Sequence, residues 1–437
     1  MSFADFIREH EGDDPVRLLL ARDKYPDIDL DLAVTTLEVR RKLKAKVPEW
    51  YAVPSLIYPS RLSGEQCSSS ETARYKAMLA ASVRREGVPP QTVAARPLPK
   101  QALGPSLLGG RGWPQVSGGT PSRLKVADLT GGMGVDCWAF AQVADEVMYN
   151  EMQEGLAEAT ELNFKELGVE NVRFSCKKVE VGKVKEVLDG FEPDVIYLDP
   201  ARRAEDGRKV FLIEECQPDV VGLLPELFEE SRFVLLKLSP MADITMACKR
   251  LGEHVKEVHV VAAGGECKEL LFLLDREWTG PCSTVVVEGE TVMEIPDQVG
   301  NDVEYCIPRV GEILFEPGKA VAKAGAFDLP CRFGLTKLGM HTHLYTGEAV
   351  PEELKYLGKW FEVLEVLPLN NRTMKEVAKR YPQAEVTARN VPMTSDLLRK
   401  KVGCASGGDI HLFGVRADAP EEAGNYLIVT KKRYGTD

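Results

Sequence analysis

The chain has 437 residues, too many for one hydrophobic core, so its length predicts two to four domains. Its composition, 44% hydrophobic and 28% charged, excludes a disordered chain, and no apolar run is long enough to cross a membrane. The net charge of −12 is concentrated in residues 126–345, which carry −18, whereas the flanks carry +5 and +1; this argues against broad binding of polyanions but permits a localised nucleic-acid contact.

The first predicted region, residues 1–86, is helical. One stretch, "LDLAVTTLEVRRKLKAKVPEW", spaces its apolar residues as a helix does and ends on Trp50, followed by Tyr51. It also carries a basic cluster: Arg40, Arg41, Lys42, Lys44 and Lys46. These residues are either a basic and aromatic RNA surface or a solvated helix face beside a core tryptophan, and the second reading is slightly favoured.

A second helix in this region is predicted to begin at a capping box, with Ser68 as the cap and Glu71 three residues later. Residues 87–123 are rich in proline and glycine and form a predicted linker.

From Leu124 the pattern changes to short apolar strands that alternate with amphipathic helices, which is typical of a parallel sheet with helices on both faces. The predicted strands are "KVADL", "EVMYN", "VRFS", "DVIYLD", "RFVLLKL", "VKEVHVV" and "CKELLFLLD". Residues 124–279 therefore form one α/β domain.

Two smaller α+β units are expected after this domain. Residues 280–345 contain the short strands "STVVVEG", "EILFEPG" and "HTHLY". Residues 346–437 alternate strands with two helices and end on a basic edge.

The cysteines do not indicate a disulfide framework or a metal site. The ten cysteines are scattered, with no CxxC pair and no Cys/His ligand spacing, and the N-terminus has no signal-peptide core. Reduced thiols and a cytoplasmic location are expected, without a metal.

A glycine loop follows the first strand of the α/β domain. Asp128 ends the strand, and Gly131, Gly132 and Gly134 open a helix, where glycine lets the backbone approach a ligand closely. Glu151 lies 20 residues after Gly131, at the end of the next strand, where a carboxylate can bind a ribose diol. Together they predict a nucleoside-containing cofactor.

The order of the glycines differs from the G-x-G-x-x-G of dinucleotide sites. "DLTGGMGVD" resembles motif I of class I S-adenosylmethionine (SAM)-dependent methyltransferases, in which this loop faces the methionine portion of SAM. A pyrophosphate would also be disfavoured by the charge of Asp128.

The fourth strand ends in "YLDPARR", at the position of motif IV in these methyltransferases. The side chain of Asp199 and the carbonyl of Pro200 are predicted to accept the two N–H bonds of an exocyclic amine and to aim its lone pair at the methyl group. The family motif continues with an aromatic residue, but here Ala201 and Arg202 follow, so the platform that stacks on a base is in doubt.

The remaining substrate contacts are expected at the same edge of the sheet. Arg202 and Arg203 bind a substrate phosphate or pair with Glu205 or Asp206. Lys237, Ser239 and Pro240 follow the fifth strand. No cysteine lies there to attack a pyrimidine ring, and Cys267, after the next strand, is more typical of a buried thiol, so nitrogen methylation is favoured over carbon methylation.

Taken together, "EQCSS", "ADLTGGMGVD", "YLDPARR", "LKLSPM", "GECKELLF" and the last 80 or so residues resemble a bacterial family of class I SAM-dependent methyltransferases with a small ferredoxin-like module and a C-terminal THUMP-like domain. The resemblance implies an α/β fold, with a Rossmann-like, seven-stranded methyltransferase domain, an N-terminal helical region and small C-terminal α+β domains. It implies SAM binding by Asp128, Thr130, Gly131, Gly132, Gly134, Asp136 and Glu151.

The motif I loop is also similar to that of bacterial rRNA guanine-N2 methyltransferases, and THUMP domains present RNA to catalytic domains. An rRNA or tRNA substrate methylated on nitrogen by direct in-line transfer is therefore expected. The basic surface would include Arg399, Lys400, Lys401 and residues 431–433. Two alternatives stay open: methylation of a small molecule or protein, and a non-catalytic RNA-binding protein that retains SAM.

Overall fold

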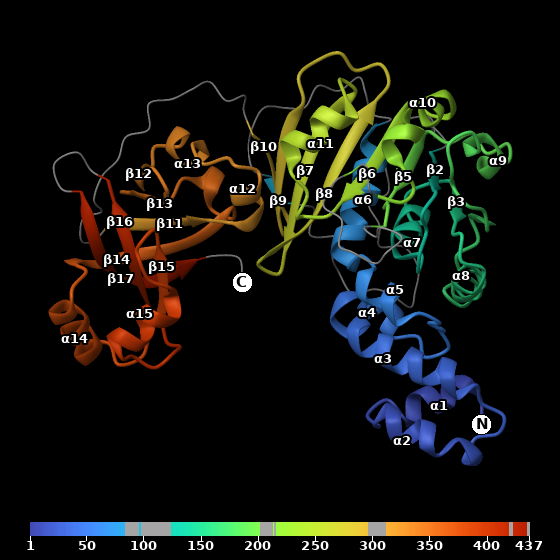
Figure 1. The fold of residues 1–437 in the computed structure, drawn as a ribbon, viewed down its shortest axis with the longest axis horizontal. Coiled ribbons are helices and arrows are strands. Elements are labelled where there is room, and N and C mark those ends of the chain that lie inside the picture. The colour runs from blue at the N-terminus through green and yellow to red at the C-terminus, as the bar shows by residue number, and fades with distance from the viewer. Residues whose placement is uncertain are drawn as a thin grey trace. The chain divides into compact units, whose positions relative to one another are not determined.

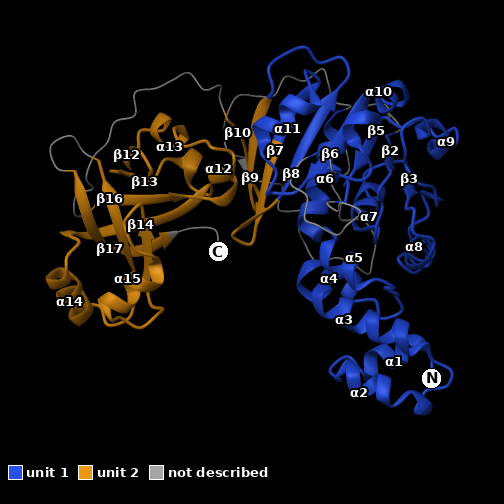
Figure 2. Ribbon diagram, viewed as in Figure 1, with its two compact units in different colours: residues 1–91, 99–258, 269–282 blue, residues 92–98, 259–268, 283–437 orange. Residues whose placement is uncertain are grey.

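The structure is a computed structural model that describes residues 1–83, 96–97, 124–201, 213, 216–295, 312–418 and 423–434. The chain divides into two compact units (Figures 1 and 2). The first comprises residues 1–91, 99–258 and 269–282, and the second comprises residues 92–98, 259–268 and 283–437. In the described part of the chain, no helix is long and apolar enough to cross a membrane.

The first unit begins with the expected helical region. Its helices are α1 (Phe3–Glu9), α2 (Pro15–Leu20), α3 (Leu30–Lys46), α4 (Pro48–Tyr51), α5 (Arg61–Gln66) and α6 (Ser70–Ser82). Asp29 caps α3 by accepting the Leu32 N–H, and α1 and α2 pack on α3 through the buried side chains of Phe6, Ile7 and Leu37.

The α/β part of the first unit contains the seven predicted strands. They are β2 (Lys125–Asp128), β3 (Glu146–Asn150), β4 (Val172–Ser175), β5 (Val195–Leu198), β6 (Phe233–Leu238), β7 (Val255–Ala263) and β8 (Glu266–Asp275), and the last two extend into the second unit. Their order in the sheet is β7-β8-β6-β5-β2-β3-β4. The alternating pattern predicts a parallel sheet. Strands β2 to β6 do pair in parallel, but β8 runs antiparallel to β6, so the prediction holds for only part of the sheet.

Helices cover this sheet between its strands. They are α7 (Val135–Ala141), α8 (Glu154–Glu166), α9 (Val184–Leu188), α10 (Val220–Glu230) and α11 (Ile244–Leu251). Strand β5 is buried along its whole length, which explains why "VIYL" is apolar without alternation. The N-terminal helix α6 packs against α7 (Figure 1), so the helical region is part of the same unit as the sheet.

The second unit contains β1 (Arg96–Pro97), β9 (Ser283–Glu288) and β10 (Thr291–Ile295), which pair antiparallel, and a separate seven-stranded sheet. Its strands are β11 (Ile313–Pro317), β12 (Thr336–Gly339), β13 (Thr342–Gly347), β14 (Gly358–Pro368), β15 (Glu385–Arg389), β16 (Ile410–Ala417) and β17 (Gly424–Tyr434). The short helices α12 (Lys319–Lys323) and α13 (Leu329–Arg332) lie between β11 and β12, and α14 (Asn371–Arg380) and α15 (Ser395–Val402) flank β15.

The seven-stranded sheet has the order β12-β13-β11-β14-β17-β16-β15 and is antiparallel except between β15 and β16. Apolar residues face both of its sides. In β17, Leu427 and Val429 pack with α14 and α15, while Ile428 joins the core on the other face. Strands β11 to β13 of the first expected module and β14 to β17 of the second share this sheet, because β14 pairs with both β11 and β17. Strand β9, expected in the first module, instead belongs to the sheet that contains β7.

Candidate active site at the carboxyl ends of the strands

The glycine loop connects β2 to α7 and has little room for side chains. A Cβ atom on Gly131 would lie 2.2 Å from the ring of Tyr149, and one on Gly134 would lie 2.6 Å from a methyl group of Thr160. Gly132 and Gly134 adopt positive φ angles of 54° and 86°. The loop therefore requires glycine at all three positions, two for their backbone conformation and two for close packing.

Glu151 joins this loop to the next strand. Its Oε2 accepts the Gly132 N–H at 3.0 Å and its Oε1 accepts the Gln153 N–H at 2.9 Å. Each carboxylate oxygen has a second lone pair and can accept a further hydrogen bond. Glu151 is buried and held in place, so its remaining lone pairs suit a ribose diol.

Asp128 is buried at the end of β2. Its Oδ1 accepts the Thr130 N–H at 3.1 Å, while its Oδ2 is buried without a hydrogen-bond partner among the described residues. Burial, followed by the nearby carboxylates of Asp136, Asp199 and Glu151, raises the pKa of Asp128 well above its ordinary value. An edge with four clustered carboxyl groups favours a cationic ligand over an anionic one.

Asp199 follows β5 and touches the glycine loop directly. Its backbone N–H donates to the Thr130 hydroxyl at 2.6 Å, which joins the two sequence motifs. Its side chain is 36% exposed and pairs with the ammonium group of Lys237 on β6. Burial opposes the charge of Lys237, but Asp199, Glu269 and Asp136 outweigh it and raise the pKa of the lysine.

Lys237 was expected to contact the substrate, and in the structure its partner is Asp199. The remaining predicted substrate residues are placed as follows. Pro200 is buried in the turn after Asp199, and Ser239 and Pro240 follow β6, where the Ser239 hydroxyl accepts the Met241 N–H at 3.1 Å. Arg202 and Arg203 lie outside the described residues.

Asp136, in the first turn of α7, contacts protein groups contributed by three elements. Its Oδ2 accepts the hydroxyls of Ser68 at 2.9 Å and Tyr197 at 2.8 Å, and its Oδ1 lies 3.0 Å from the ammonium group of Lys76. Burial disfavours the ionised form, but the ammonium groups of Lys76 and Lys237 lower the pKa of Asp136 overall. Its role in SAM binding stays a prediction.

Lys76 is the residue that the sequence analysis missed. It lies on α6, is fully buried, and donates to both oxygens of Glu269 at 2.9 Å and to the Ser68 hydroxyl at 2.8 Å. Lysine is almost never buried without a charged partner, but a sequence does not show which lysine is buried. The partners of Lys76 do lie in strings already set apart by the family resemblance: Ser68 in "EQCSS", Asp136 in "ADLTGGMGVD" and Glu269 in "GECKELLF".

In the N-terminal region, the predicted cap of α6 is wrong, and the structure decides between the two readings of Trp50. The cap of α6 is Ser69, which accepts the Thr72 N–H at 3.2 Å, because the hydroxyl of Ser68 is used by Asp136 instead. Trp50 is fully buried and so cannot stack on RNA bases, and Arg40 is buried against the carbonyls of Tyr51 and Val53. The core reading of this tryptophan is confirmed.

The expectation for Cys267 is also corrected. It was expected to be a buried thiol, but it is partly exposed.

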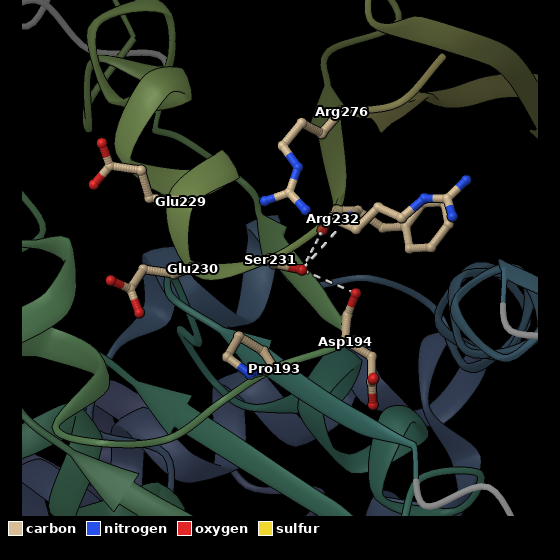
Figure 3. Close-up of a pocket in the computed structure, with 8 residues that line it drawn as sticks. Pro193, Asp194, Glu229, Glu230, Ser231, Arg232 and Arg276 are labelled. Atoms are coloured by element: carbon tan, nitrogen blue, oxygen red, sulfur yellow. Dashed lines mark hydrogen bonds between the residues drawn. The ribbon is translucent and has the colours of Figure 1, made fainter.

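A pocket lies at the opposite edge of the same sheet, around the amino ends of β5 and β6 (Figure 3). The Ser231 hydroxyl donates to the Asp194 carbonyl at 2.9 Å, and Arg232 forms a two-fold ion pair with Asp275 at 2.8 Å. Arg276 donates to the Phe228 carbonyl. These polar groups satisfy one another, and none of them belongs to the glycine loop or the Asp199 turn.

The strand order, the antiparallel seventh strand and the glycine loop after the first strand define a class I methyltransferase fold. Family models match two further parts of the chain: a ferredoxin-like domain over residues 314–354 and a THUMP domain-like module over residues 358–432. The chain thus combines a class I methyltransferase domain with a ferredoxin-like and a THUMP-like domain.

The chain is similar along nearly its whole length to the "putative methyltransferase" of Porphyromonas gingivalis W83. The two sequences are 29% identical. The crystal structure of that protein matches this structure with a TM-score of 0.77, and the match covers 99% of this chain and 98% of that chain. A curated relative, the "Uncharacterized RNA methyltransferase" of Enterococcus faecalis, is 34% identical over 94 residues. That match covers 22% of this chain and 21% of the relative, so it spans about a fifth of the relative's length.

Proposed function

We propose that this protein is a SAM-dependent methyltransferase that methylates a nitrogen atom of a base in rRNA or tRNA. The observation that carries the proposal is the hydrogen bond from the Asp199 backbone N–H to the Thr130 hydroxyl, because it links the turn that bears the expected amine-orienting carboxylate to the glycine loop. Asp199 is also exposed enough for a substrate to reach it.

The residues present fit SAM. The buried, unpartnered Oδ2 of Asp128, the close-packed glycine loop and the preset carboxylate of Glu151 suit a nucleoside that carries positive charge. When bound, SAM supplies a methyl group on a positively charged sulfur. Asp128, Thr130, Gly131, Gly132, Gly134, Asp136 and Glu151 are the proposed cofactor residues.

Asp199 and the carbonyl of Pro200 are proposed to orient the acceptor amine. Lys237 occupies one oxygen of Asp199, Oδ2, and the other can accept an N–H from the amine. This second oxygen of Asp199 would also take up the proton that the nitrogen loses when it receives the methyl group. Ser239, Pro240, Arg202 and Arg203 are the proposed substrate contacts.

Support for an RNA substrate comes from the modules around the domain. THUMP-like residues follow the methyltransferase domain, and the E. faecalis relative carries the name of an RNA methyltransferase. The charged side chains of Lys400 and Lys401 on α15 and of Lys431 and Lys432 on β17 would meet phosphates. The division of the chain into domains after residues 86, 123, 279 and 345 is part of the same proposal.

Calorimetric titration with SAM tests the cofactor. Gly132→Asp is the variant of choice, because the space beside Gly132 is open and the new carboxylate would enter the ligand space rather than the core. Gly190→Asp is the matched control, with a similar positive φ, open surroundings and a position before β5 at the other edge. Binding lost in the first and kept in the second supports the proposal, whereas no heat with wild type contradicts it.

Asp199→Ala tests the chemistry. We expect about a hundredfold loss of methyl transfer with SAM affinity unchanged within about twofold, since the carboxylate acts on the acceptor. Retained transfer would remove the catalytic assignment. A wild-type protein that binds SAM and RNA but transfers no methyl group would favour the non-catalytic alternative, which is supported by the missing aromatic after Ala201, where the sequence has Arg202.

The acidic total charge of the chain favours the other alternative, in which the substrate is a small molecule or a protein. Filter binding of structured RNA at 50 and 200 mM salt separates the two, because affinity that falls steeply with salt reports phosphate contacts. Mass spectrometry of rRNA and tRNA nucleosides from cells lacking the gene would then identify the methylated nucleoside and atom.

A further inference from the structure

A row of charged side chains crosses three strands on one face of the sheet, beside the proposed site. Tyr197 pairs with Leu235, and Lys237 pairs with Leu271, so these four side chains point to the same face. Side chains alternate along a strand, and this places Glu269, two residues from Leu271, on that face as well. Asp199, Lys237 and Glu269 therefore form a row of alternating charge across β5, β6 and β8.

Helix α6 contributes a second cation, Lys76, beside this row. The Lys76 ammonium contacts Glu269 on β8 and Asp136 on α7, and the Tyr197 hydroxyl donates to the same Asp136. Lys76 is fully buried, and the Glu269 side chain is 3% exposed. The groups that face Lys237 are thus Asp199 after β5, Glu269 from β8, Asp136 from α7, the Cys67 thiol before α6 and, next to Glu269 and Asp136, Lys76 from α6.

Packing alone does not require such a cluster. Burying an ion pair is unfavourable unless its geometry is good, and apolar side chains of similar volume stabilise a core at least as well. What these charges determine instead is the carboxylate toward which the Lys237 ammonium group is attracted. Glu269 and Asp136 each lie near two cations, Lys76 and Lys237, and the position of Lys76 decides how strongly these two carboxylates draw Lys237 away from Asp199.

We propose that Lys76 and Glu269 are positioning residues that balance Lys237 and thereby hold the Asp199 carboxylate toward the acceptor amine. The N-terminal helical region is then a working part of the methyl-transfer site rather than a separate RNA-binding surface. The role of Asp199 in this inference rests on the proposed function, but the charge balance around Lys237 does not, and the two can be measured separately.

Competitive acetylation of lysines with acetic anhydride between pH 6 and 10, read by peptide mass spectrometry, reports the reactivity of Lys237. Glu269→Gln removes a carboxylate that faces Lys237, so we expect its labelling at pH 8 to rise about threefold. Lys76→Met leaves Glu269 and Asp136 with Lys237 as their remaining cation, so its labelling should fall. Glu266→Gln, an exposed carboxylate on the same strand, is the control and should change nothing.

The opposite signs exclude a purely structural effect, because loosening the fold would raise labelling in both variants. If Lys76→Met does not fold, Glu269→Gln is compared with Glu269→Asp, which keeps the negative charge and should not raise the labelling of Lys237, whereas a loosened fold would raise it in both. Unchanged labelling in Glu269→Gln, or a rise in both variants, would overturn the inference. Methyl transfer from tritiated SAM to total RNA of cells lacking the gene gives the second readout, with kcat about tenfold lower in Glu269→Gln and SAM affinity unchanged within about twofold. Wild type that transfers no methyl group would reject the proposed function, while the labelling still decides this inference.

Discussion

Lys76 in the first unit is a fully buried basic side chain, His411 in the second is a half-buried one, and their surroundings differ. Lys76 contacts two carboxylates and a hydroxyl. His411 stacks on Phe413 with ring centroids 4.2 Å apart, lies beside Phe361, and shares a hydrogen bond with the Thr387 hydroxyl. Burial lowers the pKa of His411 to about 4, so this ring is neutral at pH 7.

The difference shows how each unit handles polar groups in its interior. The first unit retains paired charges at the carboxyl ends of its strands, where a ligand and a reacting group have to be oriented. In the second unit, the half-buried ring of His411 packs on the aromatic rings of Phe361 and Phe413. Substitutions that remove a charge should therefore have their largest effects in the first unit, and two effects of pH are expected from His411 and Glu288 in the second.

The largest effect is expected for Lys76→Met. The substitution leaves Asp136 and Glu269 buried with fewer cations, and breaking a buried ion pair costs about 3–5 kcal/mol of unfolding free energy. Lys165→Met is the matched control, since Lys165 is exposed on α8 and its pair with Glu161 contributes about 0.5 kcal/mol at most. Urea denaturation measures both variants, and equal losses would contradict the comparison.

The next effect concerns His411. Its folded pKa of about 4 lies below the ordinary 6.5, so the unfolded chain binds more protons between these values, and stability falls as pH drops through this window. The loss between pH 7 and 4.5 is roughly 3 kcal/mol at most. His411→Gln, which can keep a hydrogen bond to Thr387, should remove this part of the pH dependence in denaturation curves. A variant with the wild-type slope would show that His411 is not the titrating group.

Glu288, also in the second unit, has the opposite dependence on pH. It is buried, it accepts the Ala320 N–H at 2.6 Å, and burial raises its pKa to about 7. The folded state therefore holds more protons between about 4.5 and 7, and stability falls as pH rises through this window. Relative to wild type, Glu288→Gln should gain roughly 2 kcal/mol between pH 5 and 7.5. Parallel curves for the two proteins would refute this.

The smallest effect separates two adjacent serines. Ser69→Ala removes the cap of α6 and should cost about 1 kcal/mol. Ser68→Ala removes the hydroxyl between Lys76 and Asp136 and should cost about 1–3 kcal/mol, with a change in Lys237 labelling that Ser69→Ala does not share. The reverse ranking in thermal or urea unfolding would place Ser68 outside the charged cluster.

Much of the fold follows from local pattern. Strands β3 and β4 begin and end where the apolar runs "EVMYN" and "VRFS" do. The glycine loop could also be located, because close packing against Tyr149 and a positive φ at Gly132 leave no choice of residue type. The seven-stranded methyltransferase domain was predicted correctly for these reasons.

Contacts between distant parts of the chain could not be derived in this way. Lys76 and Glu269 are 193 positions apart, and neither differs in its neighbours from an exposed lysine or glutamate. The choice between Ser68 and Ser69 as the cap of α6 depended on Asp136, 68 positions from Ser68. Likewise, Lys237 was assigned to the substrate because its pairing with Asp199 arises only when β5 and β6 lie side by side.

The sequence by itself determined the elements, the order of the domains and the glycine loop, since period, turn residues and steric space act over a few neighbouring positions. Tertiary structure alone decided the antiparallel direction of β8, the shared sheet of the second unit and the charged cluster around Lys76. These depend on which strands and helices meet, and the free energy of a buried charge is set by the partners that the fold brings to it.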